Sequence, residues 1–230
     1  MDRRGGGASR DLCHFTGGRP VMVLAPHPDD ESLGCGGLLA ACFEADGAHV
    51  VCVTDGRMSH PGSRDWPAER LAVQREQELL AAVAALGGRT EDVSCLRHPD
   101  QAAPEGGPAV EAIAALCEER DIGTLFGPAP EDPHRDHLAV AKLARAVCAR
   151  QPGLRLFDYS VWARWRGLWA EDAAQSFETS GWRARKTAAI AAHRSQLGQL
   201  VTDDPEGFAM PPGFASFFAE QPERFREVRR

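Results

Sequence analysis

Short apolar runs rich in strand-forming residues alternate along this chain with longer stretches rich in alanine and leucine. A short apolar run bounded by turn residues is typical of a buried strand, and a longer periodic stretch is typical of a helix. We therefore expect strands at 21–25, 49–54, 93–96, 123–126 and 154–162, and helices at 34–46, 67–86, 108–120, 136–150 and 183–200. This alternation predicts an α/β fold with a mostly parallel sheet and helices on both faces.

The composition fits a single globular domain. The chain has 230 residues, of which 43% are hydrophobic and 26% are charged. No internal repeat, low-complexity tract or linker divides it. We expect residues 1–19 to form a flexible lead-in. We expect residues 203–230 to form a largely irregular tail with a short terminal helix.

Charge and cysteine content narrow the classes of partner. The net charge is -7 and no long run of like charge occurs, which argues against nucleic acid and against an anionic membrane. No stretch has transmembrane length, and the first residues lack the apolar segment of a signal peptide. The seven cysteines include no CxxC pair and mostly lie in apolar runs, so we expect reduced core cysteines in a cytoplasmic protein. The expected partner is a small molecule.

Two polar clusters directly follow predicted strands. Residues 26–31 (PHPDDE) follow the first strand, and residues 131–137 (EDPHRDH) follow the fourth. In an open parallel sheet, ligands bind beyond the carboxyl ends of the strands, where the strand order reverses. If the order is 3-2-1-4-5, the first and fourth strands are neighbours and the two clusters face each other.

The residue types in these clusters suit a catalytic metal ion. His27 and Asp30 are three residues apart, which places both side chains on one side of a helical turn. A third ligand from His134 or His137 completes two imidazoles and one carboxylate with one open position, as in catalytic zinc sites. Asp29 points elsewhere and is placed to take a proton from water and pass it to a leaving amine.

Each cluster by itself has a plainer interpretation. An HxxD or HxxH string on a loop is more often an ordinary polar turn, and Asp136 can simply cap the helix that it begins. Two such clusters at the ends of two neighbouring strands make a metal site the stronger interpretation.

The strings APHPDDE at 25–31 and HRDH at 134–137 resemble the two signature motifs of the LmbE-like (PIG-L) deacetylase family. The resemblance covers residues 20 to 200. Its further matches are TDG at 54–56, Arg75 and Glu78, LG at 86–87, PD at 99–100 with Gln101 in place of glycine, and Lys186, His193 and SQ at 195–196. The resemblance implies a Rossmann-like fold and the zinc-dependent removal of N-acetyl groups from glucosamine-containing substrates.

The resemblance assigns the metal and the base. It implies a zinc ion, or Fe²⁺ or another divalent metal in its place, bound by His27, Asp30 and His137. It implies Asp29 as the general base and afterwards the general acid.

The resemblance also assigns four surrounding residues. It implies that His134 stabilises the tetrahedral oxyanion and that Asp136 orients a metal-binding histidine. It implies contacts from Arg75 and Asp100 to sugar hydroxyls, although a solvated helix face is the plainer interpretation of Arg75.

Besides Gln101, the chain departs from the family pattern near the second motif. Some members carry a carbonyl-polarising tyrosine near the second motif, whereas the only tyrosine here is Tyr159, and Asp132 stands in that region. The segment 162–169, which is rich in tryptophan and arginine, can stack on a sugar or aglycone, cover the site, or contact another subunit.

Two other functions remain open at this point. Two histidines and a carboxylate also form the facial triad of non-haem Fe(II) oxygenases, although those sites usually lie in β-barrels. A sugar-binding relative without activity is the other alternative, and the intact catalytic positions argue against it. The loops at 56–68, 98–108 and 162–182 carry no pattern that names the substrate. A homo-oligomer is also left open.

Overall fold

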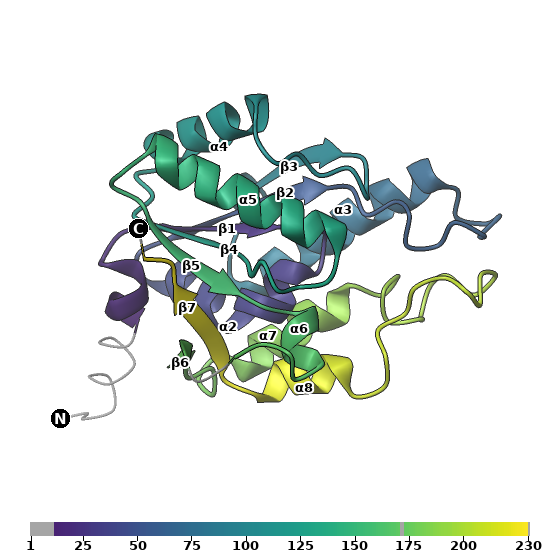
Figure 1. The fold of residues 1–230 in the computed structure, drawn as a ribbon. Helices are drawn as coiled ribbons and strands as arrows, with labels where there is room; N and C mark the ends of the chain where they lie inside the picture. The colour runs from purple at the N-terminus through teal and green to yellow at the C-terminus, as the bar shows by residue number, and fades with distance from the viewer. Residues whose placement is uncertain (1–11, 171–172, 230) are drawn as a thin grey trace.

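One seven-stranded sheet organises the chain, in a computed structural model that describes residues 12–170 and 173–229 (Figure 1). Its spatial order is β3-β2-β1-β4-β5-β7-β6. The strands are β1 (Val21–Ala25), β2 (Ala48–Thr54), β3 (Val93–His98), β4 (Thr124–Pro128), β5 (Arg155–Tyr159), β6 (Gln175–Phe177) and β7 (Glu223–Glu227).

The first five strands pair in parallel, in the predicted order 3-2-1-4-5. The prediction of five strands is incomplete, because β7 pairs antiparallel with β5 and β6 pairs antiparallel with β7. The sequence of β7 is Glu-Arg-Phe-Arg-Glu, which has no apolar run. Residues 223–227 are therefore a strand and not part of an irregular tail.

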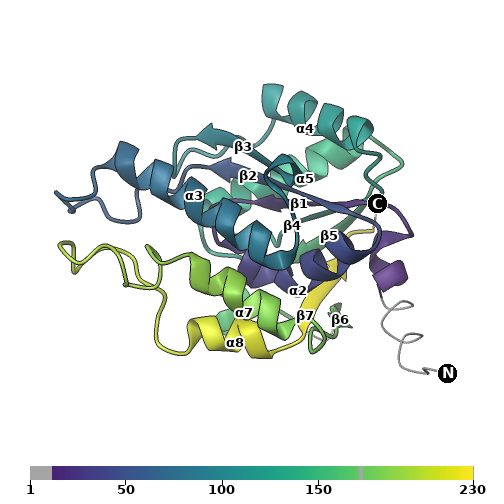
Figure 2. The same cartoon turned by 180° about the vertical axis from the view of Figure 1, so that it is seen from behind.

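Helices cover both faces of the sheet. They are α2 (Asp30–Glu44), α3 (Ala68–Leu86), α4 (Pro108–Glu119), α5 (Arg135–Arg150), α6 (Trp162–Trp165), α7 (Arg183–Ala192) and α8 (Phe214–Glu220), with a short 3₁₀ turn η1 (Thr90–Asp92) before β3. Helices α4 and α5 pack on one face and share one apolar core with the sheet. Helices α2, α3, α7 and α8 lie on the other face with a second core, as the view from behind shows (Figure 2). Strands β1 and β2 are buried along their whole length because both faces are covered.

Several element boundaries differ from those expected. Helix α2 begins at Asp30, so Asp30 and Glu31 of the polar cluster lie in its first turn and residues 26–29 form the turn that leads into it. Helix α7 ends at Ala192, and turns follow it up to residue 200. Residues 12–16 are helical, and the buried Phe15 packs against Phe157 and Phe225. The expected flexible lead-in is therefore wrong for these residues, and residues 1–11 lie outside the described part of the chain.

A buried ion pair joins β7 to α7, and the same carboxylate also binds the backbone of α2. Lys186 Nζ donates to Glu223 Oε1 over 2.6 Å, and both side chains are fully buried. Glu223 also accepts hydrogen bonds from the backbone N–H groups of Gly37 and Leu38 in α2 (2.6 and 2.8 Å). This carboxylate thus has a charged partner and two further donors, as a buried charge requires.

No helix within residues 12–170 and 173–229 has the combined length and apolarity needed to cross a bilayer.

Candidate metal and catalytic site

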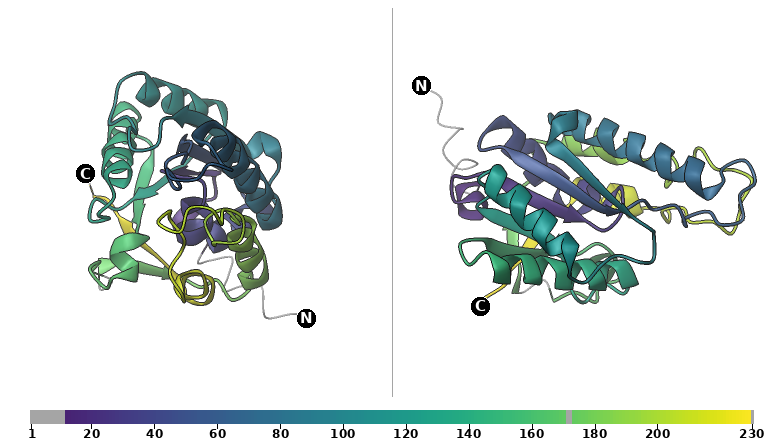
Figure 3. Two further views of the ribbon diagram at one scale, coloured as in Figure 1. Left: turned by 90° about the vertical axis from the view of Figure 1, so that its right-hand side faces the viewer. Right: turned by 90° about the horizontal axis from the view of Figure 1, so that it is seen from above.

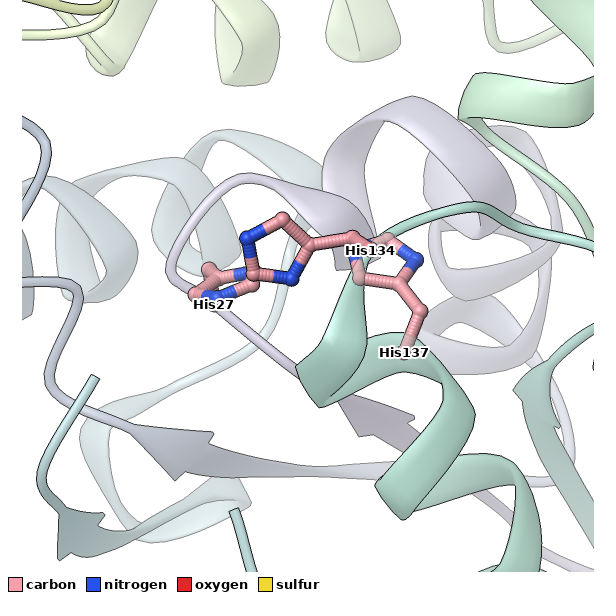
Figure 4. A group of neighbouring side chains, drawn as sticks. All are labelled: His27, His134 and His137. Atoms are coloured by element: carbon pink, nitrogen blue, oxygen red, sulfur yellow. The ribbon is translucent and has the colours of Figure 1, made fainter. Parts of the chain in front are cut away.

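A cavity of about 570 Å³ opens at the carboxyl ends of the parallel strands. The two polar clusters meet there because β1 and β4 are neighbours in the sheet. Two long connections, residues 55–67 and 193–213, extend beyond this end of the sheet, where they lie side by side (Figure 3). Six of the predicted residues line the cavity: His27, Asp29, Asp30, Arg75, Asp100 and His134. The rings of His27, His134 and His137 gather between the loop after β1 and the first turn of α5 (Figure 4).

His27 is held by carboxylates at both ring nitrogens. Its Nδ1 lies 3.3 Å from Asp30 Oδ2, and its backbone N–H donates to the same oxygen over 3.0 Å. Its Nε2 lies 3.1 Å from Asp136 Oδ2 and 3.3 Å from Asp100 Oδ1. Burial alone would lower the pKa of His27, but Asp100, Asp136 and Asp30 outweigh it and raise the pKa well above its usual value. With Nε2–H donated to Asp136, Nδ1 is left as the nitrogen that can bind a metal ion.

His137 is fixed by Asp132. Its Nδ1 lies 2.9 Å from Asp132 Oδ2, and both side chains are fully buried. Its Nε2 lies 3.2 Å from Asp30 Oδ2 but makes no hydrogen bond within the described residues. A buried nitrogen without a hydrogen bond is uncommon, and its opposite nitrogen is held by a carboxylate, as in carboxylate–histidine–metal arrangements. Burial would lower the pKa of His137, but Asp30 and Asp132 raise it to about 9.

His134 has a different environment from His137. Its Nδ1 accepts a hydrogen bond from the backbone N–H of Asp136 over 3.2 Å, so His134 caps α5. Asp136, which we considered as the cap, instead contacts His27 and accepts from the backbone N–H groups of Gln101 and Ala103 (2.7 and 3.1 Å). Burial, together with His27 and His137, lowers the pKa of His134 to about 4. Neutral His134 with Nδ1 as an acceptor carries its proton on Nε2 and is a hydrogen-bond donor there.

Distances alone leave two groups of potential metal ligands. The first group is His27, His134 and His137, and the second is His27, Asp100 and Asp136. In each group, the potential ligand atoms all lie within 4.8 Å of one another. The hydrogen bonds favour His137 over Asp136 as a metal ligand. Asp136 already accepts from two backbone N–H groups, whereas His137 Nε2 is buried without a hydrogen bond among the described residues.

Asp29 lies in a strained turn. Its φ of 140° and ψ of -28° are unusual for a residue with a side chain, and such strain costs about 1–3 kcal/mol unless the surroundings impose it. Its backbone N–H donates to Glu31 Oε2 over 3.0 Å, and Oδ2 of its side chain lies 3.2 Å from Arg75 Nη2. Burial raises the pKa of Asp29 to about 7, while Arg75 opposes that shift. A carboxyl with a pKa near neutrality is suited to exchange protons.

Arg75 is buried below this turn and is not on a solvated helix face. Only 3% of it is exposed, and it donates to the carbonyl oxygens of Pro28 (2.7 Å) and Gly56 (2.8 Å) as well as to Asp29. Asp100 accepts from the backbone N–H of Met58 over 3.0 Å and contacts His27. Both residues line the cavity, and the predicted contacts with a sugar require this position.

Three further groups of residues build this site, and of these the sequence pointed only to Trp162, within the segment 162–169. Asp132 supports His137, and Glu31 supports the backbone of Asp29. Trp162, Phe208 and Phe214 line the same cavity as the polar residues. An aspartate two residues before the second histidine motif could have drawn attention to Asp132. The local sequence around Phe208 gives no comparable signal.

The donor set fits a divalent cation. Asp29, Asp30, Asp100, Asp132 and Asp136 surround the histidines, and Arg75 is the cation paired with Asp29. The excess of carboxylates raises the pKa of both His27 and His137, so the site carries surplus negative charge that a divalent cation would neutralise. His27 Nδ1, Asp30 Oδ2 and His137 Nε2 converge as two imidazole nitrogens and one carboxylate oxygen, a ligand set that zinc uses in hydrolases.

Comparison with known proteins identifies the family. The family model for GlcNAc-PI de-N-acetylase (PIG-L) matches residues 22–148, more than half of the chain. The chain belongs to the PIG-L family. The resemblance noted in the two motifs is therefore confirmed.

Relatives and fold neighbours extend this result. A 1D-myo-inositol 2-acetamido-2-deoxy-alpha-D-glucopyranoside deacetylase of Saccharomonospora viridis is 29% identical over 249 residues, which cover 85% of this chain and 90% of that protein. An N,N'-diacetylchitobiose deacetylase of Pyrococcus horikoshii has the same fold, with a TM-score of 0.72 and 19% identity over 99% of this chain and 94% of its own. The α/β fold with a mostly parallel sheet is thus shared with deacetylases.

The same fold also carries other chemistry. GalB, the 4-carboxy-2-hydroxymuconate hydratase of Pseudomonas putida, aligns with a TM-score of 0.67 and 16% identity over 92% of this chain and 97% of its own. Fold alone therefore does not decide the reaction, and the side chains of the site must do so.

Proposed function

We propose that this PIG-L family member is a metal-dependent amide hydrolase that removes the N-acetyl group from an N-acetylglucosamine-type sugar or its conjugate. The observation that carries the proposal is the convergence of His27, Asp30 and His137 beside Asp29 in one cavity. The named activities of the relative and of the neighbour above, both deacetylases of amino sugars, support the substrate class.

In this proposal His27 Nδ1, Asp30 Oδ2 and His137 Nε2 hold zinc, with Fe²⁺ or another divalent cation as the alternative. The bound cation would act as a Lewis acid toward the amide carbonyl and would increase the acidity of a water molecule at its open position. Asp136 and Asp132 hold the opposite nitrogens of the two histidines, which orients both rings and leaves His27 Nδ1 and His137 Nε2 as the atoms that would bind the cation.

Asp29 is the proposed general base and then the general acid. Its carboxylate takes a proton from the attacking water as the new C–O bond forms at the amide carbon. It then delivers that proton to the nitrogen as the C–N bond breaks, which yields acetate and the free amine. The pKa of about 7 supports both steps, and Arg75 holds the carboxylate in place.

His134 is the proposed donor to the oxyanion. The hydrogen bond at Nδ1 leaves the proton on Nε2, so a neutral imidazole supplies a hydrogen bond without a formal charge. Asp100 is the proposed contact for a sugar hydroxyl. Contact between Arg75 and the sugar stays a prediction beside the role of Arg75 in fixing Asp29. A cytoplasmic location, expected from the cysteines, also stays a prediction.

The test measures acetate release from a panel of N-acetylglucosaminyl conjugates with metal-loaded, chelated and reconstituted protein. We expect activity that disappears on chelation, and a decrease in kcat of about 10²-fold or more for Asp29→Asn with metal still bound. Asp121→Asn is the matched control, because Asp121 is an exposed aspartate paired with Arg19 outside the cavity. Near-normal turnover of metal-loaded Asp29→Asn would contradict the assignment of the base.

A further inference from the structure

Two chemically different groups of side chains line the cavity. His27, Asp29, Asp30, Asp100 and His134 form the polar side that carries the proposed reaction. Trp162, Phe208 and Phe214, which we call the aromatic wall, line the same cavity, with Met58 and Met210 beside them. A ligand that fills the cavity therefore meets both kinds of surface.

Trp162 joins the aromatic wall, because its ring contacts both phenylalanine rings. Trp162 lies with its ring centroid 5.7 Å from that of Phe208 and 5.0 Å from that of Phe214. Phe214 is completely buried, whereas Trp162 and Phe208 are half-buried and keep part of each ring uncovered. The wall thus forms one continuous apolar surface from the core to the cavity opening.

The aromatic wall is held in place from both sides. Asp132, which contacts His137, also accepts from the backbone N–H groups of Val161 (3.0 Å) and Ala163 (2.8 Å) on either side of Trp162. On the other side, the N–H of Phe208 donates to the carbonyl oxygen of Ser59 over 2.7 Å. The wall therefore has a defined position relative to the candidate metal ligands.

This surface is poorly suited to a polyol. The hydroxyls of a cyclitol would lose water against aromatic rings that offer no hydrogen bonds, and each unpaired polar group costs free energy. The nearby polar side chains Ser59 and Gln196 already bond to each other at 3.3 Å, and Glu206 is exposed at the rim. An aryl or alkyl group would instead bury apolar area against the rings.

We propose that the aromatic wall is a subsite for an apolar aglycone, so that the substrate is an N-acetylglucosaminide of an aryl or alkyl group in preference to that of a polyol. The inference rests on the proposed deacetylation. The sugar and its acetamido group occupy the polar side, and the aglycone lies against Trp162 and Phe208.

The test compares kcat/KM for phenyl, methyl and inositol glycosides of N-acetylglucosamine with metal-loaded protein. We expect the phenyl glycoside to be preferred by about tenfold or more, the factor that burial of one ring face supplies. Phe208→Ala should abolish this preference, because kcat/KM for the phenyl glycoside should fall more than kcat/KM for the methyl glycoside. Trp162→Ala should do the same, and Trp162→Phe should retain part of the preference.

Two controls make the result specific. Trp165→Phe alters a tryptophan of the same short helix that packs on Phe214 and Phe217 but does not line the cavity, and it should keep the aryl preference. Binding of phenyl glucosaminide, measured by calorimetry on Asp29→Asn, reports the subsite without turnover and should weaken about tenfold when Phe208→Ala is added.

The outcomes separate the two proposals. Acetate release from all three glycosides with equal kcat/KM overturns the aglycone subsite and leaves deacetylation intact. An equal loss for all three in Trp162→Ala also overturns it, because the ring would then contact the sugar. Absence of acetate release from every glycoside by metal-loaded protein refutes the proposed function, and the calorimetric comparison still decides the subsite.

Discussion

Replacement of Asp132 by asparagine changes the support of His137 without changing the size of the side chain. The carboxylate of Asp132 has four partners: His137 Nδ1, Ser160 Oγ, and the backbone N–H groups of Val161 and Ala163. An asparagine offers one acceptor oxygen to this set and turns its NH₂ group toward the remaining donors. In either orientation of the amide, at least one buried backbone N–H faces another donor.

The substitution should change both the free energy of unfolding and the affinity for metal. One unsatisfied buried donor should lower the free energy of unfolding of the metal-free protein by about 1–3 kcal/mol. Loss of the charge behind His137 should weaken metal binding by about 10- to 100-fold, which corresponds to about 1.4–2.7 kcal/mol. The weaker binding should appear even where the variant remains fully folded.

The assay is a titration with a competing chelator, which gives the Kd for zinc, combined with denaturant unfolding of the metal-free protein. Ser160→Ala is the control, because it removes one donor but leaves the carboxylate and its contact with His137. The control should keep the zinc Kd within about threefold of the parent, since the charge behind the ligand is retained. An unchanged Kd in folded Asp132→Asn would refute the view that Asp132 supports a metal ligand.

Three further predictions concern buried ionisable side chains. Because burial raises the pKa of Asp29 to about 7, kcat/KM should fall about tenfold per pH unit below that value as the base becomes protonated, and a pH profile of acetate release should show this acid limb. Burial lowers the pKa of His49 to about 4, so the unfolded chain binds the proton first and the free energy of unfolding should fall as the pH drops from about 6.5 to 4. Denaturant titrations should show a smaller fall for His49→Gln. Lys186→Met leaves the carboxylate of Glu223 buried without its cation and should cost about 3–5 kcal/mol by chemical unfolding, less if Glu223→Gln is added.

The parallel part of the fold could be predicted because it depends on local patterns. The runs that form β1 and β4 are continuous and apolar, and parallel pairing follows from the helices between them. That order alone brings His27 and His134 into one crevice. Strand β7 could not be predicted in this way, because its charged residues are stabilised by partners distant in sequence.

The division of roles between the two histidines of the HxxH motif also required the structure. The spacing places both at the start of α5, but only the hydrogen bonds show that His134 uses Nδ1 as a cap and that His137 gives Nδ1 to Asp132. The aromatic wall depends on a contact between Trp162 in α6 and Phe208 in the connection 193–213, and no local pattern encodes such a contact.

The hydrogen bonds from α2 to Glu223 also bear on how the chain matures during synthesis. Gly37 and its acceptor are 186 residues apart, and at about 5–20 residues per second the ribosome needs about 10–40 s to make the intervening chain. Every candidate metal ligand, the last being His137, has been made well before that acceptor emerges. During this interval the helix that begins at Asp30 lacks the buried carboxylate that accepts from the N–H groups of Gly37 and Leu38. A nascent chain stalled before residue 223 would therefore carry a complete set of ligands on an incompletely supported helix.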